Sequence, residues 1–278
     1  MRLRQAEDHT IVFDCRFDLA APDTAERAYA TAHVPGALYL HLDRDLAGSK
    51  TGANGRHPLP SRAALQQRMA ALGVNDDTLV VGYDAQDGMY AARLWWLLRW
   101  LGHAQVQVLD GGLQAWQGAG FEVTSELPPS PDRVTGNFSD RPALVEAVDV
   151  AQLETLITTG SKARLIVDAR APDRFRGENE TMDPVGGHIP GAINRPFKQN
   201  LDAQGRFKAP QTLRAEFEAL LAGHPAAETI QQCGSGVTAC HNLLALEVAG
   251  LPGAALYPGS WSEWSADAKR PVARGAAS

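Results

Sequence analysis

The 278-residue chain has few cysteines and no long hydrophobic run. Cys15, Cys233 and Cys240 are its only cysteines, and no two of them form a CxxC pair. Such a small set excludes a dense disulfide framework, and its spacing does not fit a structural zinc site. The longest apolar run, 94–98, is far shorter than a membrane span, and the start has no apolar stretch of signal-peptide length. The sequence therefore predicts a protein of a reducing, cytoplasmic compartment, with no metal and no organic cofactor.

Blocks of like charge are also missing. The chain carries 26 Lys and Arg residues against 32 Asp and Glu residues, which gives a formal net charge of −6. Charges spread in this way argue against nucleic acid or an anionic membrane as the main partner. An anionic substrate would have to be attracted by local groups. We therefore expect a small-molecule partner, no nucleic acid and no membrane. We also expect the protein to be a monomer.

What the sequence does contain is an internal repeat. Its length suits two domains, and a hydrophobic content of 44% is enough for a core in each. Three features of the first half recur in the same order in the second, about half a chain length later. They pair His33 of HVPGA with His188 of HIPGA, Asp84 with Cys233, and Trp116 of LDGGLQAW with Trp264 of YPGSWSEW. Three matches in one order indicate a duplicated domain.

Short strands alternate with helices in each half. Strands are expected at 10–14, 38–42, 78–83, 165–168 and 228–232, and helices at 89–101 and 237–248. This alternation predicts the α/β class, with a mainly parallel sheet flanked by helices in each half. The stretch 125–142 is rich in proline and polar residues, which is typical of a linker. The predicted domains are therefore 1–124 and 143–278.

The stretch QQCGSGVTACH, residues 231–241, carries the residue types of a covalent catalyst. Cys233 follows a predicted strand and precedes a predicted helix, so backbone N–H groups and the positive end of the helix dipole face its sulfur. Gly234 and Gly236 permit the tight turn, and the donors favour the nucleophilic thiolate. Asp84 has the equivalent place in the first half, and a carboxylate cannot perform covalent sulfur chemistry. We therefore predict that the second half is catalytic and the first half inactive.

Two other classes of site share parts of this pattern. GSGVTA matches a GxGxxA dinucleotide fingerprint, but the region that should supply the acidic ribose ligand, LPGAALYPG, contains no acid. A thiol-based phosphatase also places a cysteine in a loop after a strand. It needs an arginine six residues later, and Ala239 stands there. Both patterns fit less well than a thiolate that attacks the outer sulfur of a donor, with backbone amides stabilising the product.

CGSGVTAC, the two H-[VI]-PGA motifs, the paired domains and the closing GSWSEW resemble the two-domain rhodanese-type sulfurtransferases over nearly the whole chain. The resemblance implies two tandem rhodanese-like domains and a cysteine that carries sulfur as a persulfide. Cys233 is then the sulfur carrier, and Gly234, Gly236, Val237 and Thr238 contribute to donor binding. CGSGVT is similar to the loop of 3-mercaptopyruvate sulfurtransferases, whereas thiosulfate-preferring relatives usually carry basic residues there.

The resemblance also implies an arginine that binds the anionic group of the donor. The matching residue is Arg174 in DRFRG. Mercaptopyruvate-type relatives usually carry a second arginine nine residues later, and this chain has Asp183 at that position. A bidentate carboxylate clamp would lose one arm there, unless Arg170 or Arg176 replaces it.

A relay proposed for the mercaptopyruvate branch joins the loop serine to a histidine and an acid. The resemblance matches these roles to Ser235, His33 and Asp23. The histidine of the second HIPGA motif has no loop chemistry assigned to it, so a purely structural role for His33 stays open. The stretch GRHPLP is expected to form a loop that reaches the pocket, with Arg56 or His57 as rim contacts.

The leading hypothesis is an enzyme that moves a sulfane sulfur from 3-mercaptopyruvate to a thiol or cyanide acceptor through a Cys233 persulfide. One alternative is a thiosulfate:cyanide sulfurtransferase with the same mechanism. The other is a non-catalytic sulfur carrier or partner-binding module that delivers the persulfide to a specific protein. A comparison of kcat/KM for the two donors separates the first two, and slow turnover with a stable persulfide would indicate the third.

Overall fold

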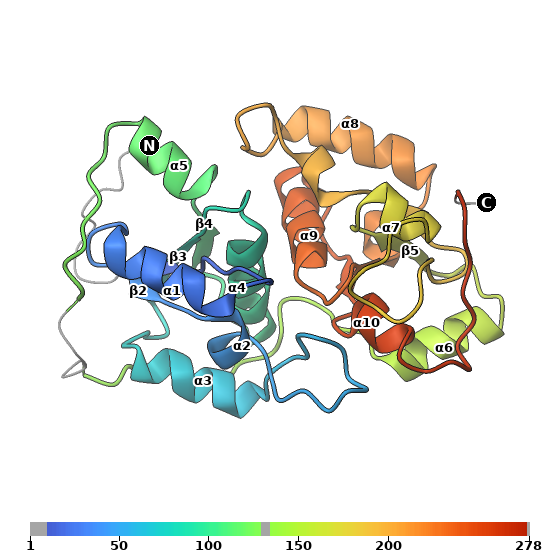
Figure 1. Cartoon of the computed structure of the whole chain (residues 1–278), viewed down its shortest axis with the longest axis horizontal. Coiled ribbons are helices and arrows are strands. Elements are labelled where there is room, and N and C mark those ends of the chain that lie inside the picture. Colours follow the sequence, from blue (N-terminus) through green and yellow to red (C-terminus); the bar gives the residue numbers. More distant parts are fainter. Residues whose placement is uncertain (1–9, 129–133, 277–278) are drawn as a thin grey trace. The chain divides into compact units, whose positions relative to one another are not determined.

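The computed structural model describes residues 10–128 and 134–276, which divide into two compact units (Figure 1). The first unit extends to Ala47 and resumes over Pro60–Leu144, and the second comprises Gly48–Leu59 and the chain from Val145 onwards. A segment of the first half of the sequence, Gly48–Leu59, therefore belongs to the second unit. The domain boundaries predicted at residues 124 and 143 stay a prediction.

Both units alternate strands with helices, as predicted. The described elements of the first unit are β1 (Thr10–Asp14), α1 (Pro22–Thr31), β2 (Leu38–Tyr39), α2 (Leu42–Asp45), α3 (Arg62–Ala71), β3 (Leu79–Tyr83), α4 (Met89–Trp100), β4 (Val106–Val108) and α5 (Gly112–Gly118). Those of the second unit are α6 (Val150–Thr158), β5 (Leu165–Asp168), α7 (Pro172–Arg176), β6 (Ile193–Asn194), the 3₁₀ helix η1 (Phe197–Asn200), α8 (Pro210–Leu221), the 3₁₀ helix η2 (Ala226–Glu228), β7 (Thr229–Gln232), α9 (Thr238–Val248), β8 (Ala255–Leu256) and α10 (Ser260–Trp264).

The strand predicted at 38–42 was too long. β2 ends at Tyr39, and the imidazole of His41 then accepts hydrogen bonds from the backbone N–H groups of Asp43 (3.2 Å) and Arg44 (3.3 Å). These bonds satisfy two of the N–H groups that a helix start leaves without an intrahelical partner. The chain therefore turns into α2 where the apolar pattern alone predicted a continued strand.

The two sheets have the same topology. The strand order is β2-β1-β3-β4 in the first unit and β6-β5-β7-β8 in the second, and every pairing is parallel. The prediction of a duplicated α/β domain with a parallel sheet is confirmed. Because β6 and β7 lie on opposite sides of β5, the carboxyl ends of β5 and β7 form a topological switch point, where open α/β sheets bind their ligands. Cys233 follows β7 directly at this point.

In the first unit, the apolar helix α4 packs on one face of the sheet. A Cβ atom at Gly82 of β3 would lie 3.2 Å from the Leu94 side chain, so glycine permits this close approach. Tyr83, the next residue, points to the opposite face and joins a buried cluster with Leu113 of α5. Among the helices in the described parts of the chain, none combines the length and apolar composition needed to cross a membrane.

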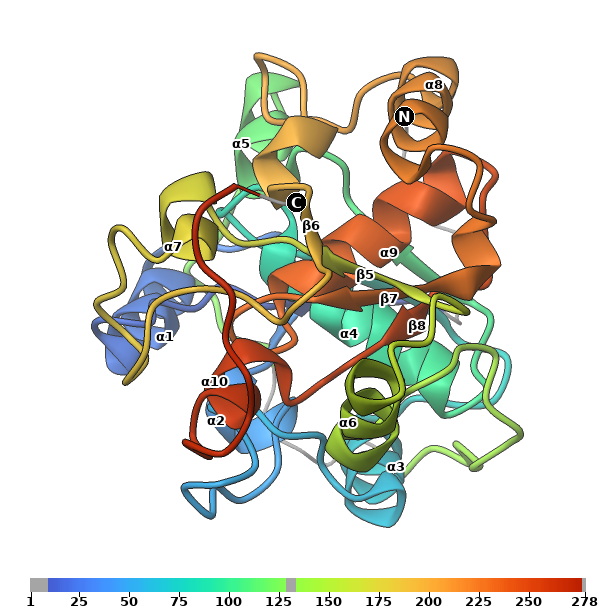
Figure 2. The same ribbon diagram turned by 90° about the vertical axis from the view of Figure 1, so that its right-hand side faces the viewer.

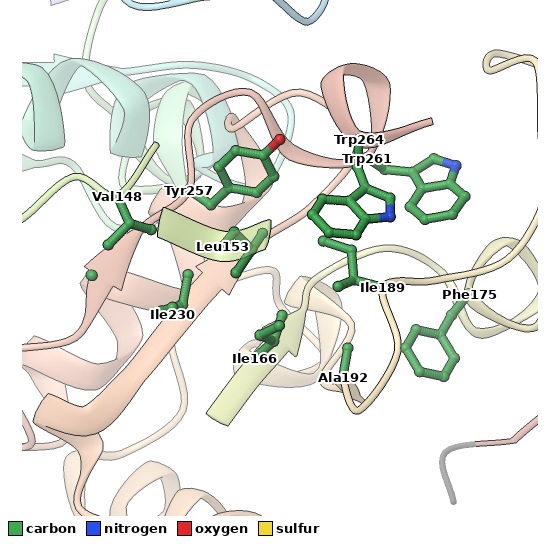
Figure 3. Close-up of a cluster of buried hydrophobic side chains, with 11 residues drawn as sticks. Val148, Leu153, Ile166, Phe175, Ile189, Ala192, Ile230, Tyr257, Trp261 and Trp264 are labelled. Carbon is green, nitrogen blue, oxygen red and sulfur yellow. The ribbon is translucent and has the colours of Figure 1, made fainter. Parts of the chain in front are cut away.

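In the second unit, α8 and α9 cover one face of the sheet, and α6 and α10 cover the other (Figures 1 and 2). Ile166 of β5 and Ile230 of β7 lie in a buried cluster with Leu153 of α6 and with Trp261 and Trp264 of α10 (Figure 3). Both tryptophans are fully buried. Burial of a large apolar side chain contributes roughly 1.5–3 kcal/mol, so this core anchors α10 firmly beside the end of β7.

Candidate functional site

Cys233 opens the loop between β7 and α9 and is only 2% exposed. The strand that delivers it, β7, is buried along its whole length, and α9 begins at Thr238, one residue later than predicted. The thiol therefore lies at the amino end of an 11-residue helix, where the helix dipole favours negative charge. This placement agrees with the nucleophile position predicted from the sequence.

The amino end of α10 holds the outer side of the cysteine loop. The N–H of Cys233 donates to Ser260 Oγ (3.1 Å), and the Cys233 carbonyl accepts from the N–H of Trp261 (2.9 Å). The carbonyl of Gly234 accepts from the N–H of Ser262 (2.9 Å). The buried ring of Trp261 thus fixes the loop that carries the nucleophile. Sequence reasoning did not identify Ser260, whose φ of +54° is unusual for a residue with a side chain.

Asp84 of the first unit shows what this kind of loop binds. Its carboxylate accepts hydrogen bonds from the N–H groups of Gln86 (2.8 Å), Gly88 (2.9 Å), Tyr90 (2.8 Å) and Ala91 (3.0 Å). Burial raises the pKa of the Asp84 carboxyl above its ordinary value, although the four N–H groups act in the opposite direction. The loop is therefore a ring of amides around an anion, and in this unit the chain supplies the anion itself.

The repeat places the corresponding backbone positions around Cys233. The residues equivalent to three of those four donors are Ser235, Val237 and Ala239. The fourth equivalent, Cys240, donates its N–H to the Val237 carbonyl instead (3.0 Å). A negatively charged sulfur on Cys233 would lie where the Asp84 carboxylate lies in the first unit, which supports the predicted roles of this loop in anion stabilisation.

The two glycines of the loop differ in what surrounds them. Gly236 has φ +74°, and a Cβ atom there would lie 2.4 Å from the Pro258 carbonyl oxygen, so both its conformation and its surroundings demand glycine. A Cβ atom at Gly234 would instead meet the guanidinium of Arg56 at 2.7 Å and that of Arg174 at 3.6 Å. Two positively charged groups therefore lie directly over the residue that follows Cys233.

Arg174 was predicted to bind the anionic group of the donor, and its place over Gly234 fits that role. The second guanidinium comes from Arg56, in the segment Gly48–Leu59, and not from Arg170 or Arg176. The Arg170 side chain binds Asp168 through Nε (3.0 and 3.2 Å) and Nη2 (2.7 Å) and lies over the Trp261 ring. Arg176 pairs with the exposed Glu178 at 2.6 Å.

Two carboxylates hold these guanidinium groups. Asp183 contacts Arg56 through one oxygen and Arg174 through the other (3.1 Å), and Glu180 pairs with Arg174 at 2.9 Å. Burial raises the pKa of the Asp183 carboxyl, against the lowering effect of Arg56. Burial acts in the same direction on Glu180, but the N–H of Met182 and the charge of Arg174 outweigh it, so the pKa of Glu180 is lowered. The cationic pair is therefore closely countered by buried acids.

The partner of the loop serine is His57. Ser235 Oγ lies 2.8 Å from His57 Nδ1, and both residues are buried. Sequence reasoning had given His57 only a rim contact. The sequence signal that indicates a functional His57 is the Arg-His pair in an otherwise Gly- and Pro-rich stretch, GRHPLP. A hydroxyl and an imidazole at this distance can pass a proton.

His33, predicted as the relay histidine, lies in the first unit. Its Nδ1 is 2.8 Å from the Tyr29 carbonyl oxygen, and its ring stacks on the Tyr29 ring at 4.2 Å. His188 makes the same pair of contacts with Phe175, at 2.8 and 3.8 Å. Identical roles in both halves favour the structural reading that the sequence left open, and the catalytic role of His33 stays a prediction. Asp23 is exposed in the first turn of α1.

The described residues contain no group of three or more His, Cys, Asp or Glu side chains that could hold a metal ion. All three cysteines are buried, and none forms a disulfide. The chemistry that the site itself offers is nucleophilic attack by a thiol next to anion-binding groups, with a serine and a histidine in hydrogen-bond contact.

Known proteins resemble this chain in sequence and in structure. The "Rhodanese-like domain" family matches residues 2–119 and again 149–267. A Pseudomonas aeruginosa protein named "Probable 3-mercaptopyruvate sulfurtransferase" is 47% identical over 277 residues, which cover 98% of this chain and 95% of that protein. The "Thiosulfate sulfurtransferase" of Bos taurus is 38% identical over 247 residues, with coverage of 86% and 80%.

Among solved structures, the 3-mercaptopyruvate sulfurtransferase from Leishmania major is 31% identical with a TM-score of 0.81, and the match covers 92% of this chain and 70% of that one. The predicted resemblance is thereby confirmed in each half of the sequence. The chain belongs to the rhodanese-like family, with two copies of the domain in tandem.

Proposed function

We propose that the protein is a sulfurtransferase that moves a sulfane sulfur from 3-mercaptopyruvate to a thiol or cyanide acceptor through a persulfide on Cys233. One observation carries this proposal. A buried thiol at the amino end of α9 lies next to Gly234, and the guanidinium groups of Arg56 and Arg174 lie directly over that glycine. The arrangement brings a nucleophile and a clamp for an anion to one place.

In the first step the Cys233 thiolate attacks the sulfur of the donor. The new S–S bond forms as the C–S bond of mercaptopyruvate breaks, and the electron pair of that bond passes to the carbon, which becomes the enolate of pyruvate. A proton then converts the enolate to pyruvate. Arg56 and Arg174 would hold the donor carboxylate, and the loop amides would stabilise the terminal sulfur of the persulfide.

Ser235 and His57 are proposed to move that proton. Their side chains are 2.8 Å apart, so the imidazole can take a proton from the hydroxyl and return it within one hydrogen bond. The donor thiol loses a proton when its sulfur is transferred, and the product carbon gains one. A hydroxyl beside the nucleophile can serve both needs without a metal.

In the second step the acceptor removes the outer sulfur. A thiolate or cyanide attacks that sulfur, the S–S bond breaks, and its electron pair returns to Cys233 as the thiolate. The acceptor leaves as a persulfide or as thiocyanate, and the enzyme is ready for another donor. The first unit carries Asp84 in place of a cysteine and is proposed to be catalytically inactive.

Thiosulfate is the second candidate donor, because two guanidinium groups can also bind its sulfonate oxygens and because the bovine relative is named a thiosulfate sulfurtransferase. The loop itself, CGSGVT, contains no basic residue. The steps through Cys233 would be the same, with sulfite as the leaving group. A ratio of kcat/KM values for the two donors on one preparation decides between them.

Intact-protein mass spectrometry after donor treatment tests the persulfide. The wild-type protein should gain one sulfur, and Cys233→Ser should gain none and lose turnover. Cys15→Ala is the matched control, since Cys15 is equally buried but lies in the first unit, and it should load sulfur normally. Turnover of Cys233→Ser at the wild-type rate would end the proposal. A stable persulfide with little transfer to small acceptors would instead indicate a sulfur carrier.

A further inference from the structure

We infer that Asp183 is a specificity-determining residue, whose charge makes the donor site select monoanionic carboxylates over dianionic donors such as thiosulfate. This inference rests on the proposed function, because it concerns the site that receives the donor of Cys233. Asp183 stands where the resemblance leads us to expect a second arginine. The structure shows that its side chain lies within the cationic clamp.

The position of Asp183 sets the charge of that clamp. The side chain is only 3% exposed, and its two oxygens contact Arg56 and Arg174, the groups that lie over Gly234. Glu180, 4% exposed, takes further hydrogen bonds from Arg174 at 2.9, 3.0 and 3.1 Å. Glu180 also lies 3.5 Å from the buried Arg170, whose guanidinium binds Asp168. Arg56 and Arg174 therefore meet two buried acids next to the nucleophile. The arginines are the more exposed members, at 26% and 19%, so a donor meets them first.

This arrangement treats donors of different charge differently. Every donor charge that binds Arg56 and Arg174 also lies close to Asp183, so the repulsion grows with the charge of the donor. A carboxylate carries one negative charge and thiosulfate carries two. Burial strengthens the effect, because a repulsion inside the protein is screened less than one at the surface. The acid therefore weakens the binding of both donors and weakens that of thiosulfate more.

A purely structural role is the competing explanation for Asp183. Its N–H donates to Glu180 (3.1 Å), and its segment is fixed near Trp261, whose indole N–H donates to the Val185 carbonyl (2.9 Å). Loss of such a role would lower the activity with both donors by the same factor. Only a role in charge selection changes the ratio between donors, and that ratio is the readout.

The test compares wild type, Asp183→Asn and a control, Glu228→Gln, with cyanide as the common acceptor. The asparagine keeps the size and one acceptor oxygen but removes the charge. For Asp183→Asn we expect the ratio of kcat/KM for thiosulfate to that for 3-mercaptopyruvate to rise on the order of tenfold, mainly through KM. Glu228 is an exposed acid of the same unit, and its neutralisation should leave the ratio unchanged. A ratio within twofold of wild type in Asp183→Asn, or a shift toward mercaptopyruvate, would overturn the inference.

A binding measurement separates this inference from the proposed function. Alkylation by neutral iodoacetamide is followed at Cys233, and fragmentation of the peptide distinguishes this residue from Cys240. Sulfate, a dianion, and pyruvate, a monoanion, should each slow the labelling. In Asp183→Asn the protection constant of sulfate should tighten more than that of pyruvate, and equal changes would refute the inference. If wild type transfers sulfur from neither donor, the proposed function fails, but the protection comparison still decides the role of Asp183.

Discussion

Replacement of Gly236 by alanine tests whether the shape of the cysteine loop is as tightly specified as the structure indicates. At φ +74°, a residue with a Cβ costs about 1–2 kcal/mol. The Cβ would also lie 2.4 Å from the Pro258 carbonyl oxygen and 3.0 Å from the Pro258 Cα, so backbone atoms must move, which adds about 1–3 kcal/mol. We therefore expect Gly236→Ala to lose roughly 2–5 kcal/mol of the free energy of unfolding.

Gly191→Ala is the matched control for this prediction. Gly191 belongs to the same unit and has φ +78°, but a Cβ atom there would meet nothing within 4 Å. It should lose only the conformational part, about 1–2 kcal/mol, and keep normal persulfide formation. Gly236→Ala should form the persulfide at least about tenfold more slowly, because the loop amides move away from the sulfur.

Urea unfolding monitored by tryptophan fluorescence gives the stabilities, and mass spectrometry after a short donor pulse gives the rate of sulfur loading. If the two alanine variants have equal free energies of unfolding, the overlap with Pro258 does not destabilise Gly236→Ala, and the reasoning is wrong. Normal loading of Gly236→Ala would show that the loop shape matters little for catalysis.

Three further predictions concern other parts of the fold and the site. Asp84→Ala leaves the four amides of the first unit without their carboxylate and should cost about 2–4 kcal/mol in urea unfolding, while the rate of sulfur loading on Cys233 stays at the wild-type value. Ser260→Gly removes the acceptor of the Cys233 N–H and relieves φ +54°, so the unfolding midpoint should change little while loading slows about threefold to tenfold in a donor pulse. Because the pKa of Asp183 is raised and that of Glu180 is lowered, a falling pH neutralises Asp183 first, beside Arg56 and Arg174, and the thiosulfate-to-mercaptopyruvate ratio should rise. The ratio cancels the titration of Cys233, and its rise with falling pH should be smaller in Asp183→Asn, which lacks the titrating carboxyl.

The sequence predicted the fold well because its strands and repeats are local signals. The apolar segments that became β1, β3 and β5 are strands of parallel sheets, and they need no partner to be recognised. The strand before Cys233, β7, has the sequence TIQQ and is indicated by its place in the repeat. The error at β2 came from His41, which ends the strand with a side chain cap that hydrophobic periodicity does not report. Cys233 and the two loop glycines were found for a similar reason. Their spacing after a strand is itself the motif.

The cationic and acidic parts of the site were harder to predict because they depend on contacts between distant residues. Arg56 and Asp183 are separated by 127 positions, and His57 and Ser235 by 178. Periodicity does not show that Gly48–Leu59 joins the second unit. The sequence therefore points to Arg170 and Arg176, which are close in the chain, as replacements for the missing arm of the clamp. Asp183 also does more than take the place of the second arginine of the clamp. Its carboxylate binds both Arg56 and Arg174.

The two copies of the domain show how one scaffold became either a closed core or a reaction site. At the start of α5, a Cβ atom on Gly112 would lie 2.2 Å from the Asp84 carbonyl oxygen, so the copy with an internal carboxylate has room only for glycine. The equivalent residue of the second copy is Ser260, which has a side chain at nearly the same φ and uses it to bind the N–H of Cys233. The change from aspartate to cysteine thus accompanies a change in the helix that supports the loop. A cysteine placed at position 84 alone would have no hydroxyl to accept its N–H, because the residue equivalent to Ser260 is Gly112. For that reason a single substitution would not turn the first unit into a second active site.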